Sequence, residues 1–392
     1  MSFNLVSPRL LRIGGGSVGD IAAVLATFGL RRPLVVTDPF MVSSGLVRRC
    51  LDPLAAAGIA AETFSDTVPE PVDTVIEAGV QRLKSGPFDC LIGFGGGSPI
   101  DTAKAMAILA AGGGKMRDYK VPVQADLAAL PIIAIPTTAG TGSEATRFTV
   151  ITDTERDEKM LIAGFAALPL AALVDYQLTL SVPPRTTADT GIDSLTHALE
   201  AYVSRRANPY SDAQALAAMR LIGPNLRTVY REPTNAPARE AMMMGATLAG
   251  VAFSNSSVAL VHGMSRPIGA HFHVPHGLSN AMLLPAVTRY GLEAAPARYA
   301  AAARAMGFAG ATDDDETACE RLATELESLN RDLAVPSPGE FGIDEAAWTG
   351  KLTLMAEQAL ASGSPGNNPR VPEAGEIVAL YREAWVSGRN RS

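Results

Sequence analysis

The pattern of apolar residues changes near the middle of the 392-residue chain, and this change restricts the folds available to it. Up to about residue 180, apolar runs alternate with stretches of helical spacing. The runs PLVVTD (33–38), DCLIGF (89–94) and PIIAIPTT (131–138) predict buried strands, and VDTVIEAGVQRLKS (72–85) and SPIDTAKAMAILAA (98–111) predict helices. Strand and helix in alternation are typical of a parallel sheet covered on both faces.

The strand pattern ends after about residue 185. Stretches rich in alanine and leucine with helical spacing take over, among them DSLTHALEAYVSRR (193–206), SDAQALAAMRLIGPNLRTVY (211–230) and PAREAMMMGATLAGVAF (237–253). We therefore expect an α/β N-terminal domain over residues 1–182 and an all-α C-terminal domain over residues 183–392, with VPPR (182–185) as a hinge.

Composition argues against several classes of partner. The formal net charge of -7 and the pI near 5.4 make nucleic acid and anionic membranes poor partners. The longest apolar run, Met160 to Val174, has 15 residues, whereas a membrane-spanning helix needs about 20. The three cysteines are widely spaced and fit neither a disulfide framework nor a zinc ribbon. With no segment at the beginning that resembles a signal peptide, we expect a cytoplasmic protein.

Two glycine-rich loops could each hold a phosphate group. Residues 14–19 (GGGSVG) satisfy G-x-G-x-x-G, and residues 95–98 (GGGS) precede a predicted helix. Phosphate binding needs glycines for close backbone approach and then a helix whose N–H groups face the anion. Ser98 is a suitable helix cap and Asp101 completes a capping-box-like pattern, but Ser17 and Asp20 do the same for the first loop. The pattern alone leaves both loops open. Asp38, at the end of a predicted strand, either binds a ribose or caps a turn.

Histidines are rare and clustered. The chain has 5, and four of them, His262, His271, His273 and His276, fall within VHGMSRPIGAHFHVPHG (261–277). The fifth, His197, lies four residues after Asp193 and therefore on the same face of a predicted helix. Asp193, His197 and two of the four histidines in residues 261–277 would together make a four-ligand site for Zn²⁺ or Fe²⁺. Spacing alone does not decide which two.

Several motifs in order resemble the iron-containing (group III) alcohol dehydrogenases. They are LVVTD, GFGGGSPIDTAKA, IPTTAGTGSEAT, TADTGIDSLTHALEAYVS, AFSNSSVALVHGM, VPHGLSNAMLLP and NNPRVP. The resemblance implies a Rossmann-like N-terminal domain, a helical C-terminal domain, and an active site in the cleft between them. It also implies a homodimer or larger homo-oligomer that uses NAD(H) or NADP(H). The reaction would reduce small aldehydes or oxidise small alcohols at one divalent metal, which polarises the substrate oxygen.

The resemblance also assigns residues. The metal ligands, for Fe²⁺ or possibly Zn²⁺, correspond to Asp193, His197, His262 and His276. The cofactor pyrophosphate is expected on the second loop, and the residues taken as cofactor-binding are Asp38, Gly95, Gly96, Gly97, Ser98, Asp101, Thr137, Thr138, Ser143 and Leu178. Because the Asp38 carboxylate would repel a 2′-phosphate, NAD is the expected cofactor. Phe253 resembles a wall of the substrate pocket, and His271 and His273 match no ligand position.

The main departure from the family pattern is at Arg266. Where many members read V-H-x-M-A-H, this chain has Arg266 in place of the second histidine. If the guanidinium reaches the pocket, it would favour a substrate that carries a carboxylate, sulfonate or phosphonate. The alternative is that Arg266 turns away and pairs with a nearby acid.

Two other enzyme classes share this architecture. A sugar-phosphate cyclase, a lyase of the dehydroquinate-synthase type, would show a glutamate and two histidines at the metal and clustered basic residues, which this chain lacks. A metal-independent reductase of the maleylacetate reductase type fits less well, because all four ligand positions are filled.

Overall fold

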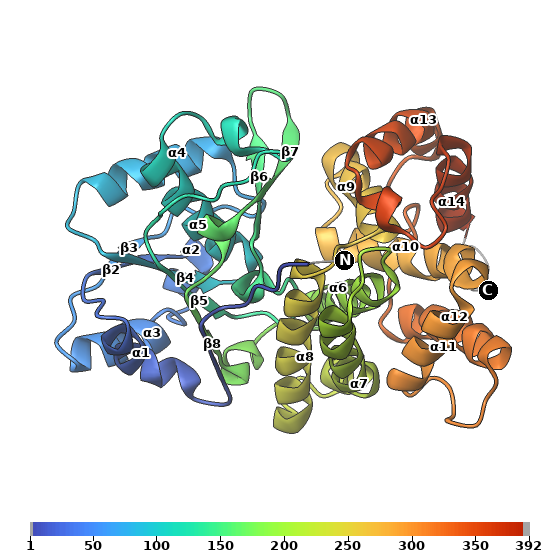
Figure 1. The fold of residues 1–392 in the computed structure, drawn as a ribbon, viewed down its shortest axis with the longest axis horizontal. Helices are drawn as coiled ribbons and strands as arrows, with labels where there is room; N and C mark the ends of the chain where they lie inside the picture. The colour runs from blue at the N-terminus through green and yellow to red at the C-terminus, as the bar shows by residue number, and fades with distance from the viewer. Residues whose placement is uncertain (1–2, 387–392) are drawn as a thin grey trace. The chain divides into compact units, whose positions relative to one another are not determined.

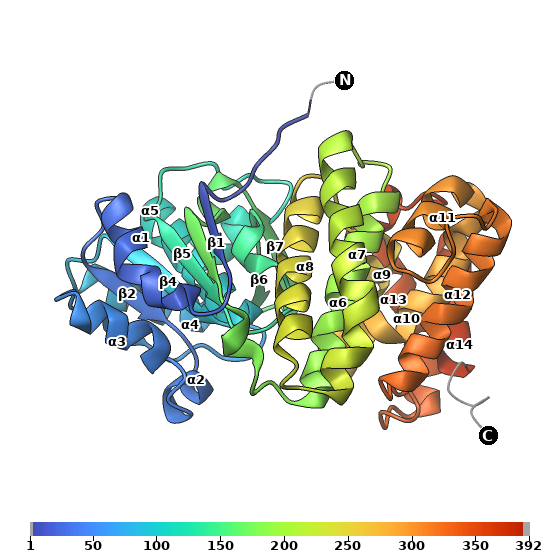
Figure 2. The same ribbon diagram turned by 90° about the horizontal axis from the view of Figure 1, so that it is seen from below.

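The computed structural model describes residues 3–386, and its helices and strands are labelled in Figures 1 and 2. The chain divides into two compact units, Met1–Ser181 and Val182–Ser392. All described strands belong to the first unit, and the second is helical.

The first unit is built on a six-stranded parallel sheet. Its strands are β1 (Leu10–Ile13), β2 (Pro33–Val36), β3 (Glu62–Phe64), β4 (Cys90–Gly95), β5 (Ile132–Pro136) and β8 (Ala171–Val174), in the order β1-β8-β5-β4-β2-β3. The central strands are buried on both faces, which is why they appear in the sequence as unbroken apolar runs. The three strands predicted from those runs are confirmed as β2, β4 and β5.

Helices cover both faces of this sheet (Figure 1). Leu91 of β4 packs with α4 (Asp73–Lys84) and α5 (Gly97–Gly112), whereas its neighbours Cys90 and Ile92 pack with α1 (Ile21–Thr27) and α3 (Arg48–Ala56). This alternation follows from the two-residue period of a strand. An antiparallel hairpin of β6 (Phe148–Asp153) and β7 (Glu158–Ala163) was not predicted.

The strand order reverses between β2 and β4. The chain passes from β2 outward to β3 at the edge of the sheet, and then returns to place β4 on the other side of β2. The carboxyl ends of β2 and β4 are therefore neighbours at the point where open α/β sheets bind ligands. The hydroxyl of Thr37, just after β2, donates to the carbonyl of Phe94 in β4 at 2.8 Å and joins the two ends.

The second unit contains nine α-helices in its described residues. They are α6 (Pro184–Val203), α7 (Pro209–Arg231), α8 (Ala236–Ser254), α9 (Leu260–Phe272), α10 (His276–Gly291), α11 (Pro296–Ala305), α12 (Asp315–Asp332), α13 (Glu345–Ala361) and α14 (Ala374–Val386). Helices α6, α7 and α8 run side by side (Figure 2). Across residues 3–386, no helix has the length and apolar character needed to cross a membrane.

Candidate functional site

Helix α6 supplies the first two candidate metal ligands. Asp193 and His197 lie four residues apart and share one face of the helix, as their spacing predicts. Both are buried, with 2% and 5% of their surface exposed. A buried carboxylate needs a partner of opposite charge or hydrogen-bond donors, and its surroundings supply both.

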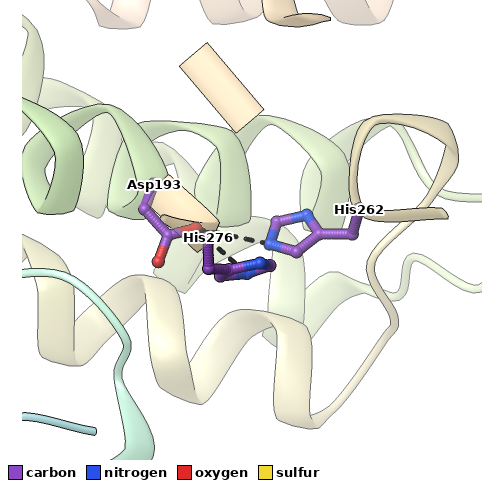
Figure 3. A group of neighbouring side chains, drawn as sticks. All are labelled: Asp193, His262 and His276. Carbon is purple, nitrogen blue, oxygen red and sulfur yellow. Dashed lines mark ion pairs between the residues drawn. The ribbon is translucent and has the colours of Figure 1, made fainter. Parts of the chain in front are cut away.

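Two further helices bring imidazoles to Asp193. His262 lies in the first turn of α9, and His276 is the first residue of α10. Oδ1 of Asp193 lies 3.5 Å from Nε2 of His262 and 3.7 Å from Nε2 of His276, and Figure 3 shows the three side chains pointing toward one another. One ligand atom from each lies within 4.8 Å of the other two. This set of one oxygen and two nitrogen donors fits Fe²⁺ or Zn²⁺.

His197 lies beside this group of three. Its Nε2 is 3.9 Å from Oδ1 of Asp193, and its ring stacks on the ring of His262 with centroids 4.5 Å apart. The His197 ring also stacks on the ring of Phe253 in α8, with centroids 4.3 Å apart and an interplanar angle of 17°. The structure thus brings together all four predicted ligands and places Phe253 against one of them.

Glu200 belongs to the same site, and the sequence prediction missed it. It follows His197 by three residues on the same stripe of α6 and is 3% exposed. Its Oε2 lies 2.7 Å from Nδ1 of His262. The signal was present as D-x-x-x-H-x-x-E in residues 193–200, a pattern that places three polar side chains on one face of the helix.

Asn280 is a second residue that the prediction missed. It lies four residues after His276 on α10 and is fully buried. Its Nδ2 donates to Oδ1 of Asp193 at 2.7 Å and lies 3.2 Å from Nε2 of His262 and 3.3 Å from Nε2 of His276. The Asn280 amide therefore contacts three of the four candidate ligands and helps to fix their orientation.

The electrostatics of the cluster favour a cation. Burial alone would raise the pKa of the Asp193 carboxyl, but the nearby imidazoles of His197, His276 and His262 outweigh it and lower that pKa. Burial acts to lower the pKa of His262, yet Glu200 and Asp193 raise it to about 9. The buried carboxylates of Glu200 and Asp193 therefore stabilise positive charge at the cluster. Because metal ligation needs neutral imidazole, a divalent cation can take the place of the protons on the histidine rings. The His276 side chain is 42% exposed, so the cluster is open on that side.

The second glycine loop follows β4 and opens α5 as expected, but its predicted cap is wrong. Helix α5 begins at Gly97, Gly96 takes the cap position, and no side chain of the described residues caps it. Asp101 does not reach back to the cap; its carboxylate accepts from Oγ of Ser143 at 2.6 Å and from the amide of Val150 at 2.9 Å. Both partners are more than forty residues away, so a local pattern could not reveal them.

The segment after β5 packs on this loop. The amide of Thr137 donates to the carbonyl of Gly95 at 2.8 Å. A Cβ at Gly96 would lie 3.6 Å from Thr138, and one at Gly97 would lie 2.9 Å from Thr141. The residues brought together here are Gly95, Gly96, Gly97, Ser98, Asp101, Thr137, Thr138 and Ser143. Leu178, in contrast, is 1% exposed and lies in the core on the α1 and α3 face.

Asp38 stands next to the same loop in the sheet. It follows β2, the neighbour of β4, and caps α2 (Pro39–Ser43) by accepting from the amide of Met41 at 2.9 Å. The capping role considered from the sequence is confirmed, and the ribose role stays a prediction.

The first glycine loop already holds an anion that belongs to the chain. The amides of Gly16 and Val18 donate to the two carboxylate oxygens of Asp175, at 3.0 Å and 3.3 Å. Asp175 is fully buried and follows β8, the strand beside β1. Its carboxylate occupies the place that a phosphate would take in this loop, which favours the second loop for the cofactor.

Arg266 lies on α9, one turn after His262. Its Nη1 donates to Oγ of Ser364 at 3.0 Å, and no residue in the described part of the chain forms an ion pair with it within 4.0 Å. The partner of Arg266 among the described residues is thus a hydroxyl and not an acid, and its role toward the substrate stays a prediction. His271 contacts Gln358 at 2.8 Å and His273 ends α9 in a left-handed conformation, so neither joins the ligand cluster.

The parallel α/β sheet reverses its strand order where such sheets bind ligands, and the helical unit holds residues that could bind a metal, as in the metal-dependent dehydrogenases. Residues 8–176 match the family described as "Iron-containing alcohol dehydrogenase", and residues 187–385 match "Fe-containing alcohol dehydrogenase family, C-terminal". The chain belongs to the iron-containing alcohol dehydrogenase family. Both the family and the fold class predicted from the sequence are confirmed.

Individual relatives cover nearly the whole chain. It is 36% identical over 382 residues to the NAD-dependent methanol dehydrogenase of Bacillus methanolicus, covering 97% of this chain and 99% of that one. A crystal structure of 1,3-propanediol oxidoreductase superposes with a TM-score of 0.94 at 35% identity, covering 98% and 100% of the two chains. Sulfoacetaldehyde reductase from Bifidobacterium kashiwanohense, in complex with NAD⁺, gives a TM-score of 0.88 at 28% identity, covering 98% and 99%.

Proposed function

We propose that this chain is an NAD(H)-linked, metal-dependent enzyme that interconverts small alcohols and aldehydes. The observation that carries the proposal is the convergence of Asp193, His262 and His276, with ligand atoms within 4.8 Å of one another. The NAD dependence of the methanol dehydrogenase relative supports the choice of cofactor. The iron-containing family supports Fe²⁺, and the same donors accept Zn²⁺.

Asp193, His197, His262 and His276 would hold the metal. When bound, a divalent metal acts as a Lewis acid on the oxygen of the alcohol or aldehyde. The chain's own contribution is to orient the donors: Asn280 holds Asp193 by a 2.7 Å hydrogen bond, and Phe253 stacks on His197.

The metal dependence can be tested with a matched pair of histidine variants. Chelation should abolish NADH oxidation with aldehydes, and Fe²⁺ should restore it. His276→Ala should bind metal at least 10-fold more weakly, whereas His271→Ala, which removes a side chain that contacts Gln358 and Phe272, should bind it as the wild type does. Activity that survives exhaustive chelation would instead favour a metal-independent reductase of the maleylacetate reductase type.

The cofactor would lie on the second glycine loop. The pyrophosphate contacts the beginning of α5 at Gly95, Gly96, Gly97 and Ser98, and Asp38 receives the adenosine ribose. Two observations support this: β2 and β4 are neighbours where the strand order reverses, and Asp175 fills the rival loop. Thr137, Thr138 and Ser143 would line the nicotinamide side, with Leu178 behind them.

Arg266 would select substrates that carry an anionic group. A guanidinium has five N–H donors, and one of them is used by Ser364. Burial lowers the pKa of Arg266, and Glu200 is the charged group that opposes this change. A carboxylate or sulfonate on the substrate would supply the bidentate partner that the described residues do not provide. The structural similarity to a sulfoacetaldehyde reductase is in keeping with this class of substrate.

The test compares aldehydes of equal length that end in a neutral or an anionic group. The wild type should prefer the anionic member by 10-fold or more in kcat/KM, about 1.4 kcal/mol of transition-state preference. Arg266→Ala should lose this preference, because a charged hydrogen bond contributes about 1.5–3 kcal/mol, while its rate on the neutral member changes little. An unchanged substrate ranking in Arg266→Ala would show that the guanidinium does not select the substrate.

We also propose that the protein is a homodimer or larger homo-oligomer, as the family resemblance suggests, and that it works in the cytoplasm, as its three widely spaced cysteines suggest. Sedimentation equilibrium of the purified protein would measure the oligomeric state, since one chain has a mass of 40.9 kDa.

A further inference from the structure

Glu200 joins two elements that the candidate metal site depends on. It is 3% exposed and extends from α6 to the beginning of α9. Its Oε1 accepts from the amide of Val261 at 2.6 Å, and its Oε2 accepts from the amide of Ala259 at 2.8 Å. Helix α9 has no cap from its own N-cap side chain, so the carboxylate of another helix satisfies its first amides.

The same carboxylate also determines which ring nitrogen of His262 carries the proton. Oε2 of Glu200 lies 2.7 Å from Nδ1 of His262. An ionised carboxylate only accepts hydrogen bonds, so in neutral His262 the proton is held on Nδ1. The lone pair is then on Nε2, the atom 3.5 Å from Oδ1 of Asp193.

We propose that Glu200 is a positioning residue for the metal: it fixes the tautomer and ring orientation of His262 and the start of α9 relative to α6. This inference rests on the proposed function, because it concerns the same metal site. It explains why one face of α6 carries Asp193, His197 and Glu200 together: two side chains bind the metal, and the third orients a ligand from another helix.

Two substitutions separate geometry from charge. Glu200→Gln keeps the size but has one acceptor oxygen, so it cannot serve Val261 and the pair of Ala259 and His262 together. Glu200→Asp keeps the charge but withdraws the carboxylate by one methylene. Glu240→Gln is the matched control, because Glu240 is exposed on α8.

The readout is Zn²⁺ affinity, measured by competition with a chromophoric chelator, together with the thermal midpoint of each metal-free variant. Both Glu200 variants should bind Zn²⁺ about 10–100-fold more weakly, and Glu240→Gln should match the wild type. In the ¹⁵N spectrum of the metal-free protein, recorded at a pH where His262 is neutral, His262 should carry its proton on Nδ1 in the wild type and lose this single state in Glu200→Gln; the chain has only 5 histidines to assign. If one Glu200 variant does not fold, the other still gives the measurement.

Three results would contradict parts of the proposal, and they are distinguishable. Wild-type affinity in both Glu200 variants would overturn the positioning role and leave the proposed function intact. Wild-type affinity in Glu200→Asp alone would show that charge, not position, matters. A wild-type chain that binds no Zn²⁺ or Fe²⁺ would overturn the proposed function itself, and the role of Glu200 with it.

Discussion

Alanine at Gly96 offers a direct test of which glycine loop holds the cofactor. At Gly95 the backbone has φ of +149° and a Cβ would lie 2.5 Å from Pro99, and at Gly97 a Cβ would lie 2.9 Å from Thr141. Gly96 differs from both, because its φ is −70° and its nearest contact, with Thr138, would be an ordinary 3.6 Å. Alanine therefore fits the folded protein at Gly96, and its methyl group projects from the backbone that the pyrophosphate would approach.

The expected loss of affinity follows from the contact that the methyl group blocks. A hydrogen bond to a charged group contributes about 1.5–3 kcal/mol, and each 1.4 kcal/mol is about tenfold in Kd. Gly96→Ala should therefore bind NADH roughly 10–100-fold more weakly, with a thermal midpoint close to that of the wild type. Calorimetric titration with NADH at fixed salt measures the first quantity, and a thermal melt measures the second.

Gly19 supplies the matched control in the first loop. A Cβ built there meets no atom within 4 Å, so Gly19→Ala should leave both the fold and NADH affinity unchanged. The reasoning is refuted if Gly19→Ala weakens NADH binding and Gly96→Ala does not, because the anion site would then lie in the loop that Asp175 occupies.

Three further predictions concern the interior. Asp175→Ala leaves the amides of Gly16, Val18 and Gln177 without their acceptor and should cost about 3 kcal/mol, a fall of roughly 6–12 °C in Tm for a unit of this size; an unchanged Tm would contradict the role given to Asp175. Burial lowers the pKa of Lys104 to about 8, below its unfolded value near 10.4, so the unfolded state binds more protons between these values and the free energy of unfolding should rise with pH in that window. Urea denaturation from pH 8 to 10 should show the free energy of unfolding of the wild type rising relative to that of Lys104→Met. A difference between the two proteins that does not change with pH would rule this out. Cys50, Cys90 and Cys319 are buried, and burial raises the pKa of Cys50 to about 12, so a thiol reagent at pH 8 should label none of them until the protein unfolds.

The fold was predictable where a buried element appears in the sequence as a run of apolar residues. Strands β2, β4 and β5 are buried at every position and gave apolar runs. Strand β3 has three residues, two of them exposed, and lies at the edge of the sheet, so it leaves no such run. The run from Met160 to Val174 contains most of β7 and all of β8, and hydropathy alone could not separate two strands within one apolar stretch.

The site was predictable only in part, because its partners come from separate helices. The four-residue spacing of Asp193 and His197 identified a pair, whereas choosing His262 and His276 among four histidines needed the family resemblance. Glu200 and Asn280 carry no histidine or cysteine signal, and their roles depend on contacts 62 and 87 residues apart along the chain. The capping box expected at Ser98 was wrong for the same reason, since Asp101 bonds to Ser143 and Val150 instead.

We expect the departure at Arg266 to change the charge balance of the site. Asp193 and Glu200 are two buried carboxylates, and together they neutralise one divalent cation when the imidazoles are neutral. With no other charged residue, the metal-loaded site would carry no net charge and would not attract an anionic substrate. Arg266 adds one positive charge, and no residue in the described part of the chain offers it an ion pair within 4.0 Å. Because a charge without a close ion-pair partner near a buried site is costly, we expect the arginine to favour a substrate that brings a negative charge. Glu200 contacts both groups in this balance: its carboxylate lies against Nδ1 of His262, and its charge opposes the effect of burial on the pKa of Arg266.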